Sequence, residues 1–201
     1  NEVRSAHVEG GEVSGTIDEQ FRHCNTKLAS THLVSSNMAL ARVQRMGEAK
    51  ENIYVIGSPE IDVHRMASGV TLQEVRERYQ IPAGEYGICI FHPVTSEAKS
   101  MGMQARALFD CLIESERNFV VILPNNDPGS QAITHVINTL PRDRFRVLPS
   151  MRFSYFSELL RNANAIIGNS SAGVREAPFL GVPSLDIGTQ RRHPKKWGFP
   201  Y

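Results

Sequence analysis

The chain has 201 residues and a formal net charge of +1, because 22 lysines and arginines stand against 21 aspartates and glutamates. This length can bury a real hydrophobic core, as one large domain or two small ones, and the mix of 41% apolar and 21% charged residues is typical of a globular protein. The balanced charge argues against nucleic acid or an anionic membrane surface as a partner, and no apolar run approaches the about 18 residues that span a bilayer.

Apolar runs of strand length alternate with helical patterns along almost the whole chain. In chain order, strands are expected at residues 3–8, 32–35, 53–56, 87–91, 119–123, 144–148, 165–167 and 183–186. Helices are expected at residues 17–29, 36–47, 72–79, 98–116, 129–139, 155–162 and 172–179. Residues 60–69 show no clear period and are predicted to be a connector.

The helical pattern of residues 98–116 carries an apolar stripe of Met101, Ala105, Leu108 and Leu112, which predicts a helix packed on a sheet. The strands are continuous apolar runs, as expected for parallel strands covered on both faces. Regular alternation of strands and helices therefore predicts an α/β fold with doubly wound parallel sheets.

The spacing of cysteines and histidines gives no sign of a metal site or a disulfide scaffold. Cys24, Cys89 and Cys111 are scattered, odd in number and without a C-x-x-C pair, which favours reduced thiols in a cytoplasmic protein. The seven histidines show no H-x-x-x-H or H-x-x-E-H spacing, so no metal is expected. The pattern G-x-S-x-G does not occur, which argues against a Ser-His-Asp hydrolase.

The first group of polar residues follows the first expected strand and runs into a helix. Glu9 lies there among three loop glycines, at the strand end where open α/β sheets bind ligands. On the helix, Asp18 and Arg22 are four residues apart and share a face. Glu19 and His23 do the same. An acid held by an arginine stays ionised and suits a base or an electrostatic clamp; alternatively, these are first-turn acids favoured by the helix dipole, with a surface pair.

The second group is Phe91-His92-Pro93-Val94-Thr95-Ser96-Glu97, again just past an expected strand. A histidine at this place can donate a hydrogen bond to a phosphate or to a leaving group. A lone histidine is also often structural, so the local pattern leaves both interpretations open.

The third group, Gly168-Asn169-Ser170-Ser171, leads from an expected strand directly into an expected helix. It offers backbone N–H groups, two hydroxyls and the positive end of a helix dipole, which together favour an anion site. Glu176, one helical turn further on, could accept hydrogen bonds from a ribose diol. The alternative is simple N-capping by one of the two serines.

With these three groups in view, the sequence resembles the hydrolysing UDP-N-acetylglucosamine 2-epimerases of sialic-acid-type sugar biosynthesis. The resemblance rests on three segments in the family's order: HVEGGEVSGTIDEQFRHCNTKL at 7–28, FHPVTSE at 91–97 and GNSSAGVREAPFLGVPSLDIGT at 168–189. It implies two Rossmann-like domains of the glycosyltransferase-B type, with a UDP-sugar in the cleft between them. Non-hydrolysing relatives carry a different loop in place of GGEVSGTIDE, which favours the hydrolysing branch.

The resemblance also implies how the chain divides into domains. Residues 1–66 are expected to be the C-terminal part of the first Rossmann-like domain with a connector, and residues 67–201 most of the second, UDP-binding domain without its closing helix. The sequence opens at Asn1, without Met or a signal sequence, on what is expected to be the end of a strand. An incomplete first domain is therefore expected, and with it a fragment that is inactive alone.

Matching motif positions then implies roles for individual residues. Glu9 and Asp18 correspond to acids at the sugar, Arg22 lies beside them, and His92 corresponds to a histidine near the diphosphate that stabilises the departing UDP. The implied substrate-binding residues are Asn125 and Met151 near the uracil, Asn169, Ser170 and Ser171 at the pyrophosphate, Glu176 at the ribose hydroxyls, and Arg191, which lies where the sequence departs from the family pattern.

The implied reaction converts UDP-N-acetylglucosamine to N-acetylmannosamine and UDP, by elimination to a glycal and hydration of that glycal. It needs no cofactor, and its only expected partners are the UDP-sugar and, at full length, further copies of the same chain. Two alternatives stay open: the same reaction on UDP-diacetylbacillosamine, and a noncatalytic UDP-binding module.

Overall fold

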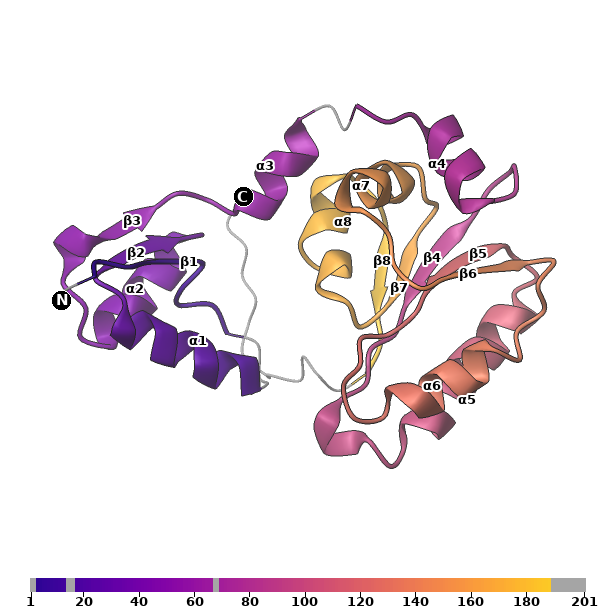
Figure 1. Cartoon of the computed structure of the whole chain (residues 1–201), viewed down its shortest axis with the longest axis horizontal. Coiled ribbons are helices and arrows are strands. Elements are labelled where there is room, and N and C mark those ends of the chain that lie inside the picture. The colour runs from indigo at the N-terminus through magenta and orange to yellow at the C-terminus, as the bar shows by residue number, and fades with distance from the viewer. Residues whose placement is uncertain (1–2, 14–16, 67–68, 189–201) are drawn as a thin grey trace. The chain divides into compact units, whose positions relative to one another are not determined.

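The computed structural model describes residues 3–13, 17–66 and 69–188, and these residues form two compact units. The first unit extends to Asp62 and the second comprises Val63–Gly188. Both are α/β structures in which every paired strand runs parallel to its neighbour, as the sequence predicts (Figure 1). No helix among the described residues has the length and apolar character needed to cross a membrane.

The first unit is a three-stranded sheet, ordered β1-β2-β3, with two helices. Its elements are β1 (Ala6–Val8), α1 (Ile17–Leu28), β2 (Thr31–Val34), α2 (Asn37–Arg45), the 3₁₀ turn η1 (Lys50–Asn52) and β3 (Ile53–Val55). Helix α2 begins after Ser36, whose hydroxyl accepts a hydrogen bond from the Ala39 N–H and caps the helix. Its apolar face packs on the sheet in a small core of Val34, Ala39, Val43 and Ile53.

The second unit has a five-stranded sheet, ordered β6-β5-β4-β7-β8. Helix α3 (Pro59–Arg65) precedes it and spans the boundary between the units. The remaining elements are α4 (Leu72–Tyr79), β4 (Gly87–Ile90), η2 (Thr95–Glu97), α5 (Met101–Glu114), β5 (Phe119–Ile122), α6 (Ser130–Ile137), β6 (Phe145–Leu148), α7 (Phe153–Arg161), β7 (Ile166–Gly168), η3 (Ser171–Gly173), α8 (Glu176–Phe179) and β8 (Ser184–Asp186).

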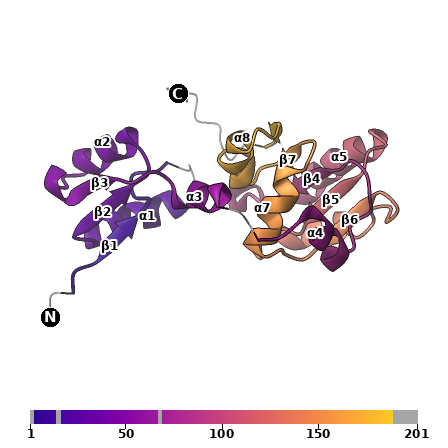
Figure 2. The same cartoon turned by 90° about the horizontal axis from the view of Figure 1, so that it is seen from above.

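Two apolar cores cover the two faces of this five-stranded sheet. Alternate residues of β4 belong to different cores, because Ile88 and Ile90 pack with α4 and α7, whereas Cys89 packs with α5 and α6. Figure 1 shows α5 and α6 on the opposite side of the sheet from α7 and α8, and Figure 2 shows α4 lying with α7. The doubly wound arrangement expected from the apolar strands is confirmed in this unit.

Burial on both faces does not extend to the first unit. Val8, Tyr54, Val55 and Ile56 are all 45% exposed or more in the structure. The expectation that every strand is covered on both sides is therefore wrong for β1 and β3, and also for the edge strand β8 of the second unit, whose three residues are all exposed. Apolar sequence alone does not distinguish a strand covered by two helical layers from one covered by a single layer.

Two expected elements differ from the structure. The connector predicted at residues 60–69 contains helix α3, which begins at Pro59 with acidic residues in its first turn and ends on basic ones. The single helix predicted at residues 172–179 is instead η3 followed by the four-residue α8. Pro178 explains the break, because it has no N–H to donate to a preceding turn and is tolerated only in the first turn of a helix.

Candidate functional site

The predicted site residues of the second unit lie together at the carboxyl edge of its sheet. Because all five strands are parallel, the segments that follow β4, β5, β6 and β7 all begin at the carboxyl edge of the sheet. The chain adds β5 and β6 on one side of β4, then returns to add β7 on the other. Open α/β sheets bind ligands at such a switch point, and the segments after β4 and β7 carry His92 and Asn169.

The side chain of Asn169 joins these two segments. Its Nδ2 donates to the His92 carbonyl oxygen at 2.8 Å, and its Oδ1 accepts from the His92 backbone N–H at 2.7 Å. Asn169 is only 4% exposed. The family resemblance implies that Asn169 binds substrate. In the structure its amide is engaged with the backbone of His92, and this contact fixes the position of the histidine.

The ring of His92 is oriented by the backbone of the next segment. Its Nδ1 lies 3.3 Å from the Asn125 backbone N–H and accepts from it, so the proton of the neutral ring is on Nε2. Burial lowers the pKa of His92, since desolvation disfavours the charged ring, and the carboxylate of Asp127 opposes that shift. His92 is therefore a neutral donor through Nε2–H at neutral pH.

The loop after β7 depends on a glycine at its start. Gly168 has φ of +138°, and a Cβ added there would lie 1.9 Å from the carbonyl oxygen of Ile90 on the neighbouring strand. Only a residue without a side chain lets the loop leave the sheet in this direction. The loop then presents two consecutive backbone N–H groups, of Ser170 and Ser171, which donate to no acceptor within the part of the chain that the structure describes.

Support for an anion site comes from these N–H groups and not from a helix dipole, because the dipole at this position is small. A 3₁₀ turn and a four-residue helix replace the expected two-turn helix, so few peptide dipoles add together. The hydroxyl of Ser170 accepts a long hydrogen bond of 3.4 Å from the Ala172 N–H, the capping role weighed as the alternative. The hydroxyl of Ser171 is exposed.

Glu176 lies at the start of α8 and is buried, with 8% of its surface exposed. Its Oε2 is 3.3 Å from Nε2 of His64, a buried residue of α3. Nothing in the sequence pattern of residues 60–69 singles out His64. The imidazole nitrogen is a polar atom that faces this buried carboxylate at ion-pair distance, where burial makes any polar contact matter more than it would in water.

The remaining predicted binding residues of this unit also follow strands of the sheet. Asn125 comes after β5, and its Nδ2 donates to Asp127 at 2.5 Å. Met151 comes after β6 and packs against the core that contains Ile90. Arg191 lies outside the described residues.

The first unit gathers its polar residues at the carboxyl edge of its own sheet. Glu9 follows β1 and accepts a hydrogen bond of 2.7 Å at Oε1 from the hydroxyl of Ser58, which comes after β3. Glu12 accepts one from the hydroxyl of Ser35, which comes directly after β2. Glu9 has φ of 59°, a left-handed conformation that is uncommon for residues other than glycine and is often found at functional sites.

Helix α1 also contacts the loop that follows β1. Arg22 donates to the carbonyl oxygen of Glu12 at 3.1 Å, and Glu19 pairs with His23 at 3.6 Å, as their spacing predicts. Asp18 is exposed in the first turn of the helix. The structure therefore ties Arg22 to the loop that carries Glu9, whereas Asp18 faces solvent.

The sequence motifs do not single out Ser35, Ser58 or Glu12 as site residues. Ser35 follows β2 directly and Ser58 comes three residues after β3, so both lie beyond strand ends like the residues of the other groups. Their contacts with the acids depend on the spatial order of the strands, which the local sequence does not specify.

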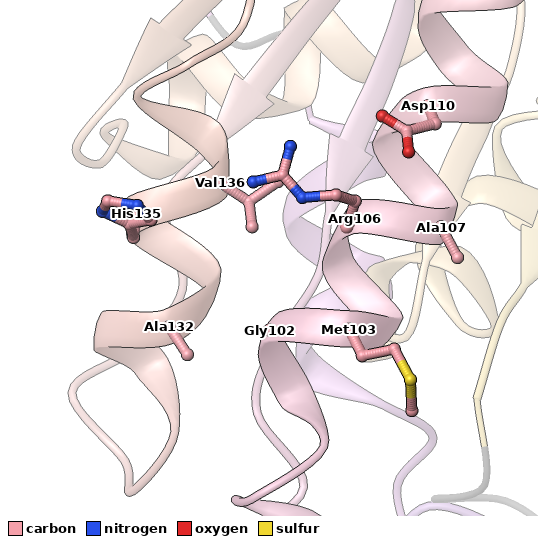
Figure 3. Close-up of a pocket in the computed structure, with 8 residues that line it drawn as sticks. All are labelled: Gly102, Met103, Arg106, Ala107, Asp110, Ala132, His135 and Val136. Carbon is pink, nitrogen blue, oxygen red and sulfur yellow. The ribbon is translucent and has the colours of Figure 1, made fainter.

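Two hollows lie on the α5–α6 side of the second unit. The larger is a groove between these helices, and Figure 3 shows Arg106 and Asp110 on one helix and His135 on the other. It contains none of the predicted site residues. The second hollow lies beside Asn125 and is lined mainly by polar residues of α6 and the loop before it. The described residues contain no cluster of histidine, cysteine, aspartate and glutamate that could hold a metal ion.

Comparison with known proteins places the chain in a sequence family. A family model described as UDP-N-acetylglucosamine 2-epimerase matches residues 1–196. A UDP-N-acetylglucosamine 2-epimerase of Neisseria meningitidis serogroup B is 46% identical over 92% of the chain and 49% of its own length. A UDP-N,N'-diacetylbacillosamine 2-epimerase (hydrolyzing) of Legionella pneumophila is 29% identical over 92% of the chain and 50% of its own length. The chain thus spans about half the length of these relatives.

Solved structures share the fold. A UDP-GlcNAc 2-epimerase from Neisseria meningitidis bound to UDP-GlcNAc superposes with a TM-score of 0.77 at 15% identity, over 94% of this chain and 54% of that one. One from Methanocaldococcus jannaschii, in complex with UDP-GlcNAc and UDP, has a TM-score of 0.75 at 17% identity, over 92% and 53%. At these identities the likeness establishes the fold of the two α/β units.

Proposed function

Because the chain belongs to the UDP-N-acetylglucosamine 2-epimerase family, we propose that it is part of a hydrolysing 2-epimerase that converts UDP-N-acetylglucosamine to N-acetylmannosamine and UDP. The observation that carries the proposal is the meeting of His92 and the Gly168–Ser171 loop at the switch point of the second sheet. In this proposal the second unit binds UDP and the first unit supplies acids to the sugar.

The UDP site has the chemistry that a diphosphate needs. The backbone N–H groups of Ser170 and Ser171 and the exposed Ser171 hydroxyl are donors, and Nε2–H of His92 is a further one. A neutral histidine donates without the cost of burying an additional charge. These donors stabilise the negative charge that grows on UDP as the bond between C1 and the diphosphate breaks, which makes UDP a better leaving group.

The elimination also removes the proton on C2, which is not acidic in a sugar. A carboxylate takes this proton while the electron pair of the C2–H bond forms the C1–C2 double bond and the diphosphate departs. Water then adds across that double bond, with its hydroxyl on C1 and a proton on C2 delivered to the opposite face. The balance is UDP-N-acetylglucosamine plus water to N-acetylmannosamine plus UDP. Glu9 and Asp18 share the proton transfer and the positioning of the sugar.

Glu9 has the geometry of an oriented base. The Ser58 hydroxyl donates to its Oε1 and so restrains the carboxylate, and its backbone adopts a left-handed conformation just past the end of β1. Arg22 supports the same loop through the Glu12 carbonyl oxygen. Residues 1–66 belong to the sugar-binding domain in this proposal, and residues 67–201 to the UDP-binding domain.

A second substrate is favoured by one observation, the 29% identity to a relative named for UDP-N,N'-diacetylbacillosamine. The 46% identity to a relative named for UDP-N-acetylglucosamine favours the latter. A substrate panel with identification of the released sugar separates the two. UDP binding without turnover of any UDP-sugar at full family length would instead indicate a binding module.

The acid assignment is tested in a protein that spans the full length of the relatives. We expect Glu9→Gln and Asp18→Asn each to slow UDP release about 10²–10⁴-fold, the usual contribution of a positioned acid or base. Glu51→Gln, an exposed acid of η1, is the matched control and should keep native turnover. Near-native turnover in both test variants would overturn the assignment.

A further inference from the structure

We propose that His64 is a positioning residue that orients the carboxylate of Glu176 toward the ribose hydroxyls of the nucleotide. The inference rests on the proposed function, because it takes Glu176 as the acid that recognises the ribose. It adds a residue that no motif contains, on a segment that the sequence predicts to be a simple connector.

Helix α7 holds the imidazole of His64 in place. Nδ1 lies 2.7 Å from the Ser157 hydroxyl, and the ring of Phe153 packs against the imidazole with 4.9 Å between ring centroids. Arg161 donates to the carbonyl oxygen of His64 at 2.7 Å. His64 is 1% exposed, so side chain and backbone are both fixed.

The two ring nitrogens of His64 face different partners. Nδ1 faces the Ser157 hydroxyl, which can donate, and Nε2 faces Oε2 of Glu176 at 3.3 Å. The consistent assignment has the Ser157 O–H donating to Nδ1, which places the ring proton on Nε2, the nitrogen that faces the carboxylate. A chain of polar contacts, a hydrogen bond at Nδ1 and a charge-facing contact at Nε2, therefore runs from α7 through α3 to the first residue of α8.

This chain supplies an orientation that α8 itself cannot supply. Glu176 begins a helix of only four residues, so its own element gives little rigidity. The contact at Oε2 restricts rotation of the carboxylate about its last bond. Since Glu176 is in the same short segment as Ser170 and Ser171, its orientation fixes how the ribose lies relative to the diphosphate donors.

Comparing two nucleotides distinguishes a specific effect of His64 on ribose recognition from a general effect on the structure of the site. UDP has the ribose hydroxyls that Glu176 would accept from, and 2′,3′-dideoxy-UDP lacks them. We expect His64→Leu to weaken UDP binding about tenfold, the size expected when one polar contact to a charged group is lost, and to leave binding of the dideoxy nucleotide unchanged. His64→Gln, which retains an amide donor, should recover part of the loss. Calorimetric titration of the chain measures all of these affinities.

Other outcomes overturn the inference in distinguishable ways. Equal weakening of UDP and dideoxy-UDP binding, or native affinity for both, contradicts the role of His64 and leaves the UDP site intact. Failure of the folded native chain to bind UDP contradicts the proposed function and the inference with it. Thermal unfolding checks each variant. If His64→Leu does not fold, Ser157→Ala, which removes the partner of Nδ1, carries the same test and should show the smaller UDP-specific loss.

Discussion

The loops that follow β1 and β7 both use a glycine to avoid a clash with a neighbouring backbone, but different contacts hold them in place. Each contains a glycine where a side chain would strike a neighbouring backbone: Gly11 against the Ala39 carbonyl oxygen at 2.5 Å, and Gly168 against that of Ile90 at 1.9 Å. The loop after β7 leaves a sheet with a core on both faces, whereas the loop after β1 leaves a sheet with only four core residues. Packing fixes the loop after β7, and polar contacts fix the loop after β1.

This difference matches the chemistry that each loop offers. The loop after β1 presents acids and is tied by hydrogen bonds from Ser58, Ser35, Arg22 and Arg42, which donates to the Gly11 carbonyl oxygen. The loop after β7 presents N–H donors and is tied by one buried amide, Asn169. We infer that the loop after β7, the proposed diphosphate site, is the more rigid of the two, and that the acids of the loop after β1 keep more freedom to adjust to a ligand.

The largest effect is expected from Gly168→Ala. The added Cβ meets the backbone of a strand with a core on both faces, and φ of +138° is strained for alanine, so the free energy of unfolding should fall by about 3–4 kcal/mol. Gly84→Ala is the matched control, because Gly84 has φ of +106° but nothing within 4 Å of the added Cβ, and it should cost about 1–2 kcal/mol. Urea unfolding followed by circular dichroism measures both; equal losses would show that packing does not fix this loop.

A smaller loss is expected from Gly11→Ala, because α2 packs on a smaller core and can shift. We expect about 2–3 kcal/mol, in the unfolding of the first unit. Gly57→Ala is a close control, since φ is +79° against +78° and its added Cβ meets nothing within 4 Å. A loss for Gly11→Ala larger than that for Gly168→Ala would reverse the proposed order of rigidity.

Removal of the buried amide should cost less again. Asn169→Ala leaves both the N–H and the carbonyl oxygen of His92 without their partner, so we expect about 1–3 kcal/mol and weaker binding of UDP. Asn162→Ala removes an exposed amide that contacts Glu158, and it should change stability by no more than about 0.5 kcal/mol. Native UDP affinity in the Asn169 variant would mean that the position of His92 does not matter to the ligand.

The smallest effect is the dependence of stability on pH. Burial lowers the pKa of His92, and burial together with the charges of His32 and Arg22 lowers the pKa of His7. The unfolded chain therefore binds protons more readily, and stability falls as the pH drops from about 6.5 through the folded values. One half-buried histidine in each unit, His7 and His92, therefore contributes to that loss.

Variants that remove the titration should flatten this dependence. His92→Asn keeps an acceptor near the position of Nδ1 and should lose less stability than the native chain between pH 7.5 and 5. His135→Asn, at an exposed site on α6, is the control and should follow the native curve. An unchanged slope in His92→Asn would contradict the lowered pKa of the His92 ring.

Local signals in the sequence predict much of the fold. Helix α4 is predicted residue for residue, and the structure shows a capping box of Thr71 and Glu74 at its start. The fully buried β4 is predicted one residue too long, from its apolar run. Two prolines in the sequence mark the elements whose prediction is wrong. Pro178 indicates a break in the helix expected at residues 172–179, and Pro59 indicates the start of α3.

The partners of the site residues are harder to predict. Glu9 and Ser58 are 49 residues apart and meet only because β1 and β3 flank β2 in parallel. His64 and Ser157 are 93 residues apart, and their contact depends on where α3 packs. The sequence locates the residues that follow strands, and the fold determines which of them meet.

The central claim is that UDP binds at the switch point of the second sheet. Hydrogen–deuterium exchange of the chain with and without saturating UDP tests it most directly. The account predicts protection in residues 91–93 and 168–176. Protection confined to the groove between α5 and α6, or no change at any UDP concentration, would contradict it.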